Sequence, residues 1–277
     1  MWAARFSRRH ITLLDRSFED DLAASLDPSR VTVRYGRQWR VSQPQITSDF
    51  VSGKFGFVRR SAGSAIRFDE DREDFIVEDA PATQGNFVFY VVHLPSRVVA
   101  FEERLPDIRR QSFIGAMELL LREANAYWDL DSLSDEEDFE EWLAGIDLVT
   151  RFRATLKRPN PSPIRHARDV AELIEATNAT SLVIEAGSAP EGAEGLEVTD
   201  TILGAAARHA GAGNGDFRVT GISGQSRRFF DSARRLFGRQ LRLTDQTSEA
   251  EIVEQLRPIA VEAARVAGIE STQASDD

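Results

Sequence analysis

Alternating apolar and polar positions in the first half of the chain predict a strand-rich domain. The clearest pair of strands is NFVFYVVH at 86–93 and RVVAFEE at 97–103, because two runs of β-branched and aromatic residues flank a short turn containing Pro95. Gly, Pro, Ser and Asp separate further runs of this kind, so we expect a meander of antiparallel strands. These shorter runs occupy residues 5–14, 31–35, 38–42, 54–60 and 75–78.

Two helices are predicted within this strand-rich part. Ser17 and Asp20 have the spacing of a capping box, and Phe18 and Leu22 follow on one helical face. Apolar residues also recur at helical spacing after Pro106, which predicts a helix over 107–126. We expect this second helix to lie on the sheet and to close a first domain at residues 1–128.

The pattern changes after an acidic run, which we interpret as a linker at residues 129–145. Beyond it, strand-like and helix-like segments alternate, at 146–157, 164–178, 181–185, 199–210, 216–223, 225–237, 239–244 and 249–267. The sequence therefore predicts an α+β protein, with a strand-rich N-terminal domain and a packed helix, followed by an alternating β/α second domain at 146–268. The polar residues 269–277 are expected to form a flexible tail.

Composition narrows the class of protein further. The chain of 277 residues contains no cysteine, which removes disulfides, thiolate nucleophiles and cysteine-based metal sites. No apolar run approaches the roughly 18 residues that a membrane-spanning helix needs. We therefore expect a cytoplasmic protein without membrane insertion.

Charge is segregated along the chain, although the formal net charge is −11. Residues 61–150 hold 21 acidic and 7 basic groups, whereas residues 151–168 hold six basic groups and no acidic one. Residues 227–242 hold six basic groups and one acidic group. Two basic tracts in an acidic protein suggest a local surface for polyanions.

The second basic tract belongs to the predicted helix at 225–237. At 100° per residue, Phe229, Phe230 and Phe237 fall within one arc and the arginines face the other way. The turn at 221–226 would open this helix, and we leave open whether its backbone N–H groups bind an anion or form a plain tight turn.

The first tract contributes a strand whose alternation places Arg151, Arg153 and Lys157 on one side. Together the two tracts supply material for a groove that follows DNA phosphates, and a solvated basic surface is the alternative interpretation. The candidate phosphate contacts are Arg151, Arg153, Lys157, Arg158, Arg165, Arg168, Ser226, Arg227, Arg228, Arg234, Arg235 and Arg239.

Motifs for catalysis and cofactor binding do not match this chain. The four histidines have no metal-ligand spacing, and the acidic run lacks the pattern of a Ca²⁺ loop. The glycines at 211–215 follow a predicted helix, the reverse of the order that a dinucleotide site needs. We expect no catalytic residues, no metal and no cofactor.

The ordered features of the chain resemble the RexA-like (Rex-type) phage exclusion proteins of temperate phages. The matching segments run from RQWRVSQPQI and GKFGFVRR through NFVFYVVH, RVVAFEERL and FIGAMELLL to RFRATLK, ELIEATNAT, SLVIEAG and LTDQTSEAEIVEQL. This resemblance implies a two-domain homodimer, related in fold to the recombination-associated protein RdgC, that binds double-stranded DNA without sequence preference. It also implies a role in prophage exclusion or lysis–lysogeny control. The acidic net charge of this chain differs from what the resemblance implies, namely a protein that binds DNA.

The leading hypothesis is a non-enzymatic, sequence-nonspecific DNA-binding protein of prophage exclusion or antiviral defence. A second hypothesis is a protein-interaction or sensor component of a defence system, in which the acidic first domain binds a basic protein partner. A hydrolase or nuclease of unfamiliar type is the third. The first hypothesis predicts that the arginines of 151–168 and 227–242 converge on one surface that lacks interleaved carboxylates. Arginines that are split across opposite faces, or paired with Asp and Glu, would count against it and favour the second hypothesis.

Overall fold

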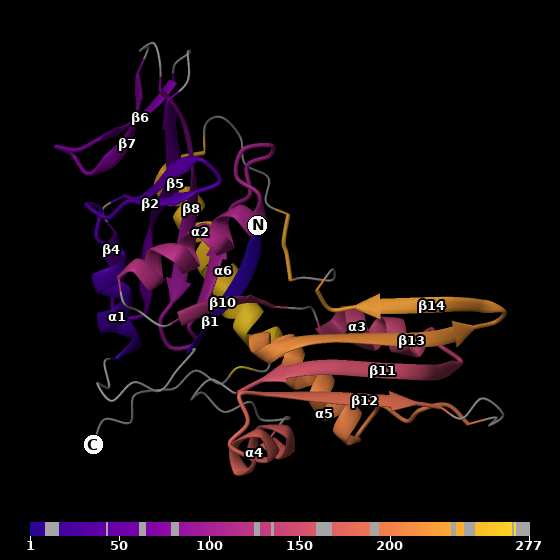
Figure 1. Ribbon diagram of the computed structural model, residues 1–277. Coiled ribbons are helices and arrows are strands. Elements are labelled where there is room, and N and C mark those ends of the chain that lie inside the picture. The colour runs from indigo at the N-terminus through magenta and orange to yellow at the C-terminus, as the bar shows by residue number, and fades with distance from the viewer. Residues whose placement is uncertain are drawn as a thin grey trace. The chain divides into compact units, whose positions relative to one another are not determined.

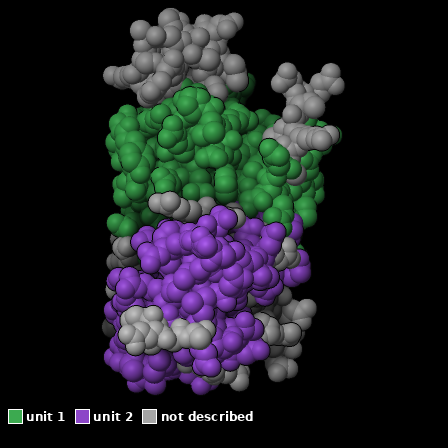
Figure 2. All heavy atoms as spheres, turned by 90° about the vertical axis from the view of Figure 1, so that its right-hand side faces the viewer, with its two compact units in different colours: residues 1–130, 238–261 green, residues 131–237, 262–277 purple. Residues whose placement is uncertain are grey.

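The computed structural model describes residues 1–8, 17–42, 44–60, 65–78, 83–124, 128–133, 136–158, 168–188, 194–233, 237–240, 247–267 and 269. Helices and strands are both abundant among them, so the predicted α+β class is confirmed. The chain forms two compact units (Figures 1 and 2). Unit 1 comprises residues 1–130 and 238–261, and unit 2 comprises residues 131–237 and 262–277.

This division differs from the predicted domain boundaries in two respects. Residues 238–261, which we expected in the second domain, belong to unit 1. Residues 129–145, which we interpreted as a linker, contain the end of strand β10 (Trp128–Ser132) and helix α3 (Glu136–Ala144). The acidic run resembled a linker because acidic residues of α3 lie on its exposed side, whereas Phe139 of the same helix is buried.

Unit 1 is built on an eight-stranded sheet with the order β10-β1-β9-β8-β5-β3-β2, and β4 pairs with β5. Its strands are β1 (Trp2–Arg8), β2 (Thr32–Arg34), β3 (Arg37–Val41), β4 (Gln45–Ile46), β5 (Phe50–Arg60), β8 (Thr83–His93) and β9 (Val98–Phe101). A separate hairpin consists of β6 (Ala65–Asp69) and β7 (Asp74–Glu78). The predicted antiparallel pairing of residues 86–93 with the following run is confirmed.

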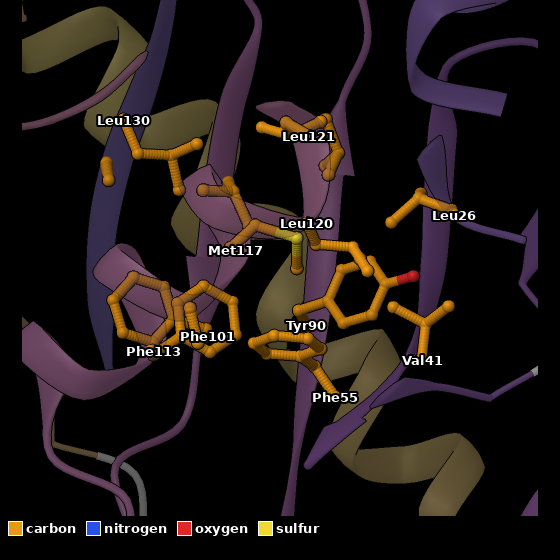
Figure 3. Packing of buried hydrophobic residues seen from close by; sticks show 14 of the residues in the cluster. Leu26, Val41, Phe55, Tyr90, Phe101, Phe113, Met117, Leu120, Leu121 and Leu130 are labelled. Atoms are coloured by element: carbon orange, nitrogen blue, oxygen red, sulfur yellow. The ribbon is translucent and has the colours of Figure 1, made fainter. Parts of the chain in front are cut away.

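Two helices, α1 (Phe18–Ser25) and α2 (Arg110–Glu123), contribute to the core of unit 1. The hydroxyl of Ser17 accepts a hydrogen bond of 3.0 Å from the backbone of Asp20, which confirms the predicted cap of α1. On the sheet side of α2, the rings of Phe101 and Phe113 stack with centroids 3.9 Å apart (Figure 3).

A buried lysine joins three elements of unit 1. The side chain of Lys54 on β5 is 10% exposed, and its ammonium group lies 3.1 Å from carboxylate oxygens of Asp74 and of Glu249. Asp74 begins β7, and Glu249 is the first residue of α6 (Glu249–Val266).

Among the described residues, no helix combines the length and apolar composition that crossing a membrane requires.

Unit 2 contains a four-stranded antiparallel sheet with the order β12-β11-β13-β14. Its elements are β11 (Leu148–Lys157), α4 (Arg168–Ala176), β12 (Ser181–Gly187), α5 (Ile202–His209), the turn η1 (Ala210–Asn214), β13 (Gly215–Ser223) and β14 (Ser226–Asp231). One face of this sheet, which we call the inner face, contributes side chains to a core with α3, α4 and α5. Its opposite is the outer face.

The helix predicted over 225–237 is wrong, because residues 226–231 form strand β14. Phe229 and Phe230 point to opposite faces, and Phe230 pairs with Val219 and packs 5.4 Å from Phe217 in the core. Pairing with β13 and burial of Phe230 override a pattern that also fits a helix. The expected β-α repeat therefore ends in a hairpin.

A two-residue turn connects the strands of this hairpin. Gly224 adopts a φ of +59°, which a first turn position of type II′ requires, and its N–H donates to a carboxylate oxygen of Asp147 at 2.7 Å. Ser226 pairs with Ser223 as the first residue of β14, so the turn at 221–226 leads into a strand, and of the two interpretations left open the plain tight turn holds. The strand expected at 239–244 lies largely outside the described residues.

Candidate nucleic-acid interface

The outer face of the sheet in unit 2 carries the basic residues of β11. Phe152, Ala154 and Leu156 are buried on the inner face. Arg151 and Arg153, which alternate with these residues along the strand, are exposed, and so is Lys157 at the end of the strand. The predicted placement of these three cations on one side is confirmed, because successive side chains in a strand alternate between faces.

Strand pairing adds residues from β13 and β14 to this face. Arg153 lies opposite Arg218 of β13, and Arg151 lies opposite Thr220. Thr220 in turn lies opposite Phe229 of β14. Residues directly opposite each other share a face, with Cβ atoms roughly 5 Å apart. Arg227 shares the outer face because it is two residues from Phe229 along β14.

We call this surface the basic face, defined by its cations Arg151, Arg153, Lys157, Arg218 and Arg227. Three carboxylates share the same face, namely Glu185, Asp216 and Asp231. The guanidinium of Arg218 lies 3.3 Å from Asp231, and Lys157 lies 2.5 Å from Asp131. Carboxylates are therefore interleaved with the cations and neutralise two of them directly, so the predicted surface without interleaved carboxylates is wrong for this face.

Three arginines of the basic face stay available for a ligand. Arg151, Arg153 and Arg227 are exposed, and they form no ion pair or side-chain hydrogen bond with any residue that the structure describes. Arg151 and Arg153 lie on β11, and Arg227 lies on β14. In the sheet, β13 separates these two strands. The spacing between neighbouring strands is about 4.8 Å, so all three are within reach of one short polyanion.

The other candidate residues are distributed elsewhere or fall outside the described part of the chain. Arg228 lies opposite the buried Gly221, so alternation turns it away from the basic face. Arg158 is exposed beyond the end of β11. Arg239 belongs to unit 1, where it donates to the backbone oxygen of Gly238 at 3.2 Å.

For Arg168 the structure describes only the backbone, at the start of α4, and Arg165, Arg234 and Arg235 lie outside the described residues. The predicted convergence therefore holds for the arginines of β11 and for Arg227, and it does not hold for Arg228 and Arg239. Two members of the face, Arg218 and Phe229, were not among the candidates. Alternation in DFRVTGIS at 216–223 could have identified Arg218.

Apart from the basic face, unit 2 has a pocket with a mostly apolar lining. It lies between α3 and α5, and its lining includes Phe139, Leu143, Val198, Ala207 and Phe217. Among the described residues, no group of three or more His, Asp or Glu is placed to hold a metal ion. The pocket therefore offers chiefly surface for van der Waals contact.

Comparison of the chain with protein-family models, with curated proteins and with solved structures finds no match. The resemblance to RexA-like proteins accordingly stays a prediction.

Proposed function

We propose that the protein binds DNA without sequence preference through the basic face of unit 2. The observation that carries this proposal is the exposure of Arg151, Arg153 and Arg227 on one sheet surface, without an ion pair to any described residue. Guanidinium groups form bidentate contacts with phosphate oxygens. Because phosphates are the same at every base pair, such contacts position the protein without reading sequence.

The charges of the face limit how strongly salt can weaken this binding. Arg218 and Lys157 already have carboxylate partners, so about three arginines are left to release counterions from DNA. Three phosphate contacts to a duplex correspond to a slope near −2.7 in a plot of log affinity against log salt. Affinity should then fall by about 40-fold between 50 and 200 mM salt.

Fluorescence anisotropy of a labelled duplex of 30 base pairs tests the proposal. The titration compares the wild type with a double variant, Arg151→Gln and Arg153→Gln, at both salt concentrations. We expect the double variant to bind at least about tenfold more weakly at 50 mM salt and to lose about two units of the salt slope.

Arg228→Gln is the matched control, because this exposed arginine lies opposite a buried inner-face position of the same sheet. It should bind within about twofold of the wild type. Equal losses in the control and the double variant would refute the basic face as the site. Absence of binding to the duplex and to a single strand at 50 mM salt would refute DNA binding and favour a protein partner instead.

The biological setting is a further part of the proposal and rests on the RexA-like resemblance. We propose a homodimer that acts in prophage exclusion. Light scattering measures the mass of the particle, for which a dimer predicts twice the 30.9 kDa of one chain. Plaque counts on cells that express the wild type or the double variant test exclusion. Equal plaque numbers in both, and in cells without the protein, would refute this role.

A further inference from the structure

The basic face carries an aromatic side chain that the core does not use. Phe229 in β14 is 67% exposed, whereas its neighbour Phe230 is 2% exposed. Its ring makes no aromatic or cation contact with any residue that the structure describes. The exposed ring of Phe229 is therefore an apolar surface that a ligand could cover, with a gain in free energy from its burial.

The neighbours of Phe229 leave its ring accessible and surround it with cations. The short side chain of Thr220 lies directly opposite on β13, and Arg151 follows on β11 in the same row across the sheet. Arg227 lies two residues away on the same strand and the same face. A flat ring beside unpaired guanidinium groups complements a base attached to a phosphodiester.

From this arrangement, and resting on the proposed DNA binding, we infer that the occupant of the basic face is single-stranded DNA, with a base stacked on Phe229. A duplex keeps its bases stacked on one another inside the helix, so it offers phosphates to the arginines but no base to the ring. A single strand offers both. Stacking on an aromatic side chain is tolerant of base identity, because every base has a π-face.

The inference predicts a preference that charge alone does not. With the same three arginines, phosphate contacts to a single strand have the smaller salt slope, and affinity should fall by about 20-fold between 50 and 200 mM salt instead of about 40-fold. Stacking adds affinity that is independent of these counterions. The single strand should therefore bind more tightly than the duplex, with a shallower dependence on salt.

Anisotropy titrations of the full chain with a labelled 30-base single strand of mixed sequence, and with its duplex, test this inference. Phe229→Ala should weaken binding of the single strand by about 5- to 100-fold and leave duplex binding within about twofold. Phe229→Trp should restore single-strand binding, and the fluorescence of the new indole should be quenched as a base stacks on it.

Val183→Ala is the matched control, because Val183 is 50% exposed on the outer face of β12 but lies away from the row that contains Phe229. It should change neither affinity. Circular dichroism of each variant checks that the chain is folded. We expect both variants to fold, because the side chains of Phe229 and Val183 are exposed.

The outcomes separate this inference from the proposed function. Duplex binding that depends on Arg151 and Arg153, with no preference for single strands and no effect of Phe229→Ala, overturns the inference and leaves the proposed function standing. Failure of both DNA forms to bind at 50 mM salt overturns both. A single strand that binds more tightly than the duplex, and that loses affinity in the Phe229→Ala variant but not in the Val183→Ala variant, supports the inference.

Discussion

The hydroxyl group of Tyr90 gives the sharpest test of the packing in unit 1. Tyr90 lies in β8, is fully buried, and has no hydrogen-bond partner for its hydroxyl among the described residues. Figure 3 shows the oxygen directed toward the apolar side chains of Leu26 and Val41. The absence of a side chain at Gly53 makes room for it, since a Cβ there would lie 3.1 Å from the oxygen.

Replacing Tyr90 with Phe should stabilise the protein. A buried hydroxyl without a partner costs about 1–3 kcal/mol of desolvation, and Phe removes this cost while keeping the ring. The small void left by the oxygen offsets part of the gain. We therefore expect Tyr90→Phe to raise the free energy of unfolding by about 1 kcal/mol at pH 7.

The same burial predicts an alkaline signature, because it raises the pKa of Tyr90 well above its usual value. Below about pH 10 the side chain is protonated in both the folded and the unfolded states. Above that pH only the unfolded state ionises, so the wild type should lose about 1.4 kcal/mol of stability per pH unit through this group. Tyr90→Phe should lack this loss.

Urea unfolding followed by tryptophan fluorescence measures both effects. Three of the four tryptophans belong to unit 1, among them Trp39, which packs 5.3 Å from Phe55 in its core, so most of the signal reports on this unit. Tyr35→Phe is the control, since Tyr35 is 62% exposed and its hydroxyl has no such cost. A Tyr90→Phe variant that is less stable than the wild type, or that keeps the alkaline loss, would refute the unpaired hydroxyl.

Three further predictions concern stability and are read from urea midpoints. Lys54→Met should cost about 1–3 kcal/mol, because it removes a mostly buried cation that holds two carboxylates; an unchanged midpoint would contradict this. Gly215→Ala should be far more damaging than Gly224→Ala. A Cβ at Gly215 would lie 2.1 Å from a backbone oxygen. A Cβ at Gly224 would meet open space, so only the positive φ would destabilise the Gly224→Ala variant, by about 1 kcal/mol. Burial raises the pKa of Glu102, so its ionisation weakens the folded state as pH rises above about 4.5. Glu102→Gln should therefore gain stability relative to the wild type between pH 4 and pH 7, and a constant difference would refute the shift.

Local patterns in the sequence determined much of the fold of this protein. The longer strands of unit 1, such as β5 and β8, the Ser17 cap and the shared side of Arg151, Arg153 and Lys157 follow from the order of neighbouring residues, whereas β4, β6 and β10 were not predicted. A strand alternates its side chains with a period of two whatever it pairs with, so the face of a residue relative to its neighbours is a local property. The α+β class follows from the same patterns.

Pairing between distant segments decided the rest. Residues 226–231 fit a helical pattern as well as a strand, and only the edge of β13 and the burial of Phe230 against the core select the strand. The ion pair of Lys157 with Asp131 joins residues that are 26 positions apart. Such partners depend on the register and order of strands, which local periodicity does not contain.

The candidate site shows the same division. The sequence by itself determined that β11 presents its cations on one side. Only the tertiary structure decided that Arg227 and Phe229 join them, that Arg228 faces away, and that Asp231 neutralises Arg218. The physical reason is that side-chain direction is set within one strand, whereas the surface of a sheet is assembled from strands that meet through long-range backbone hydrogen bonds.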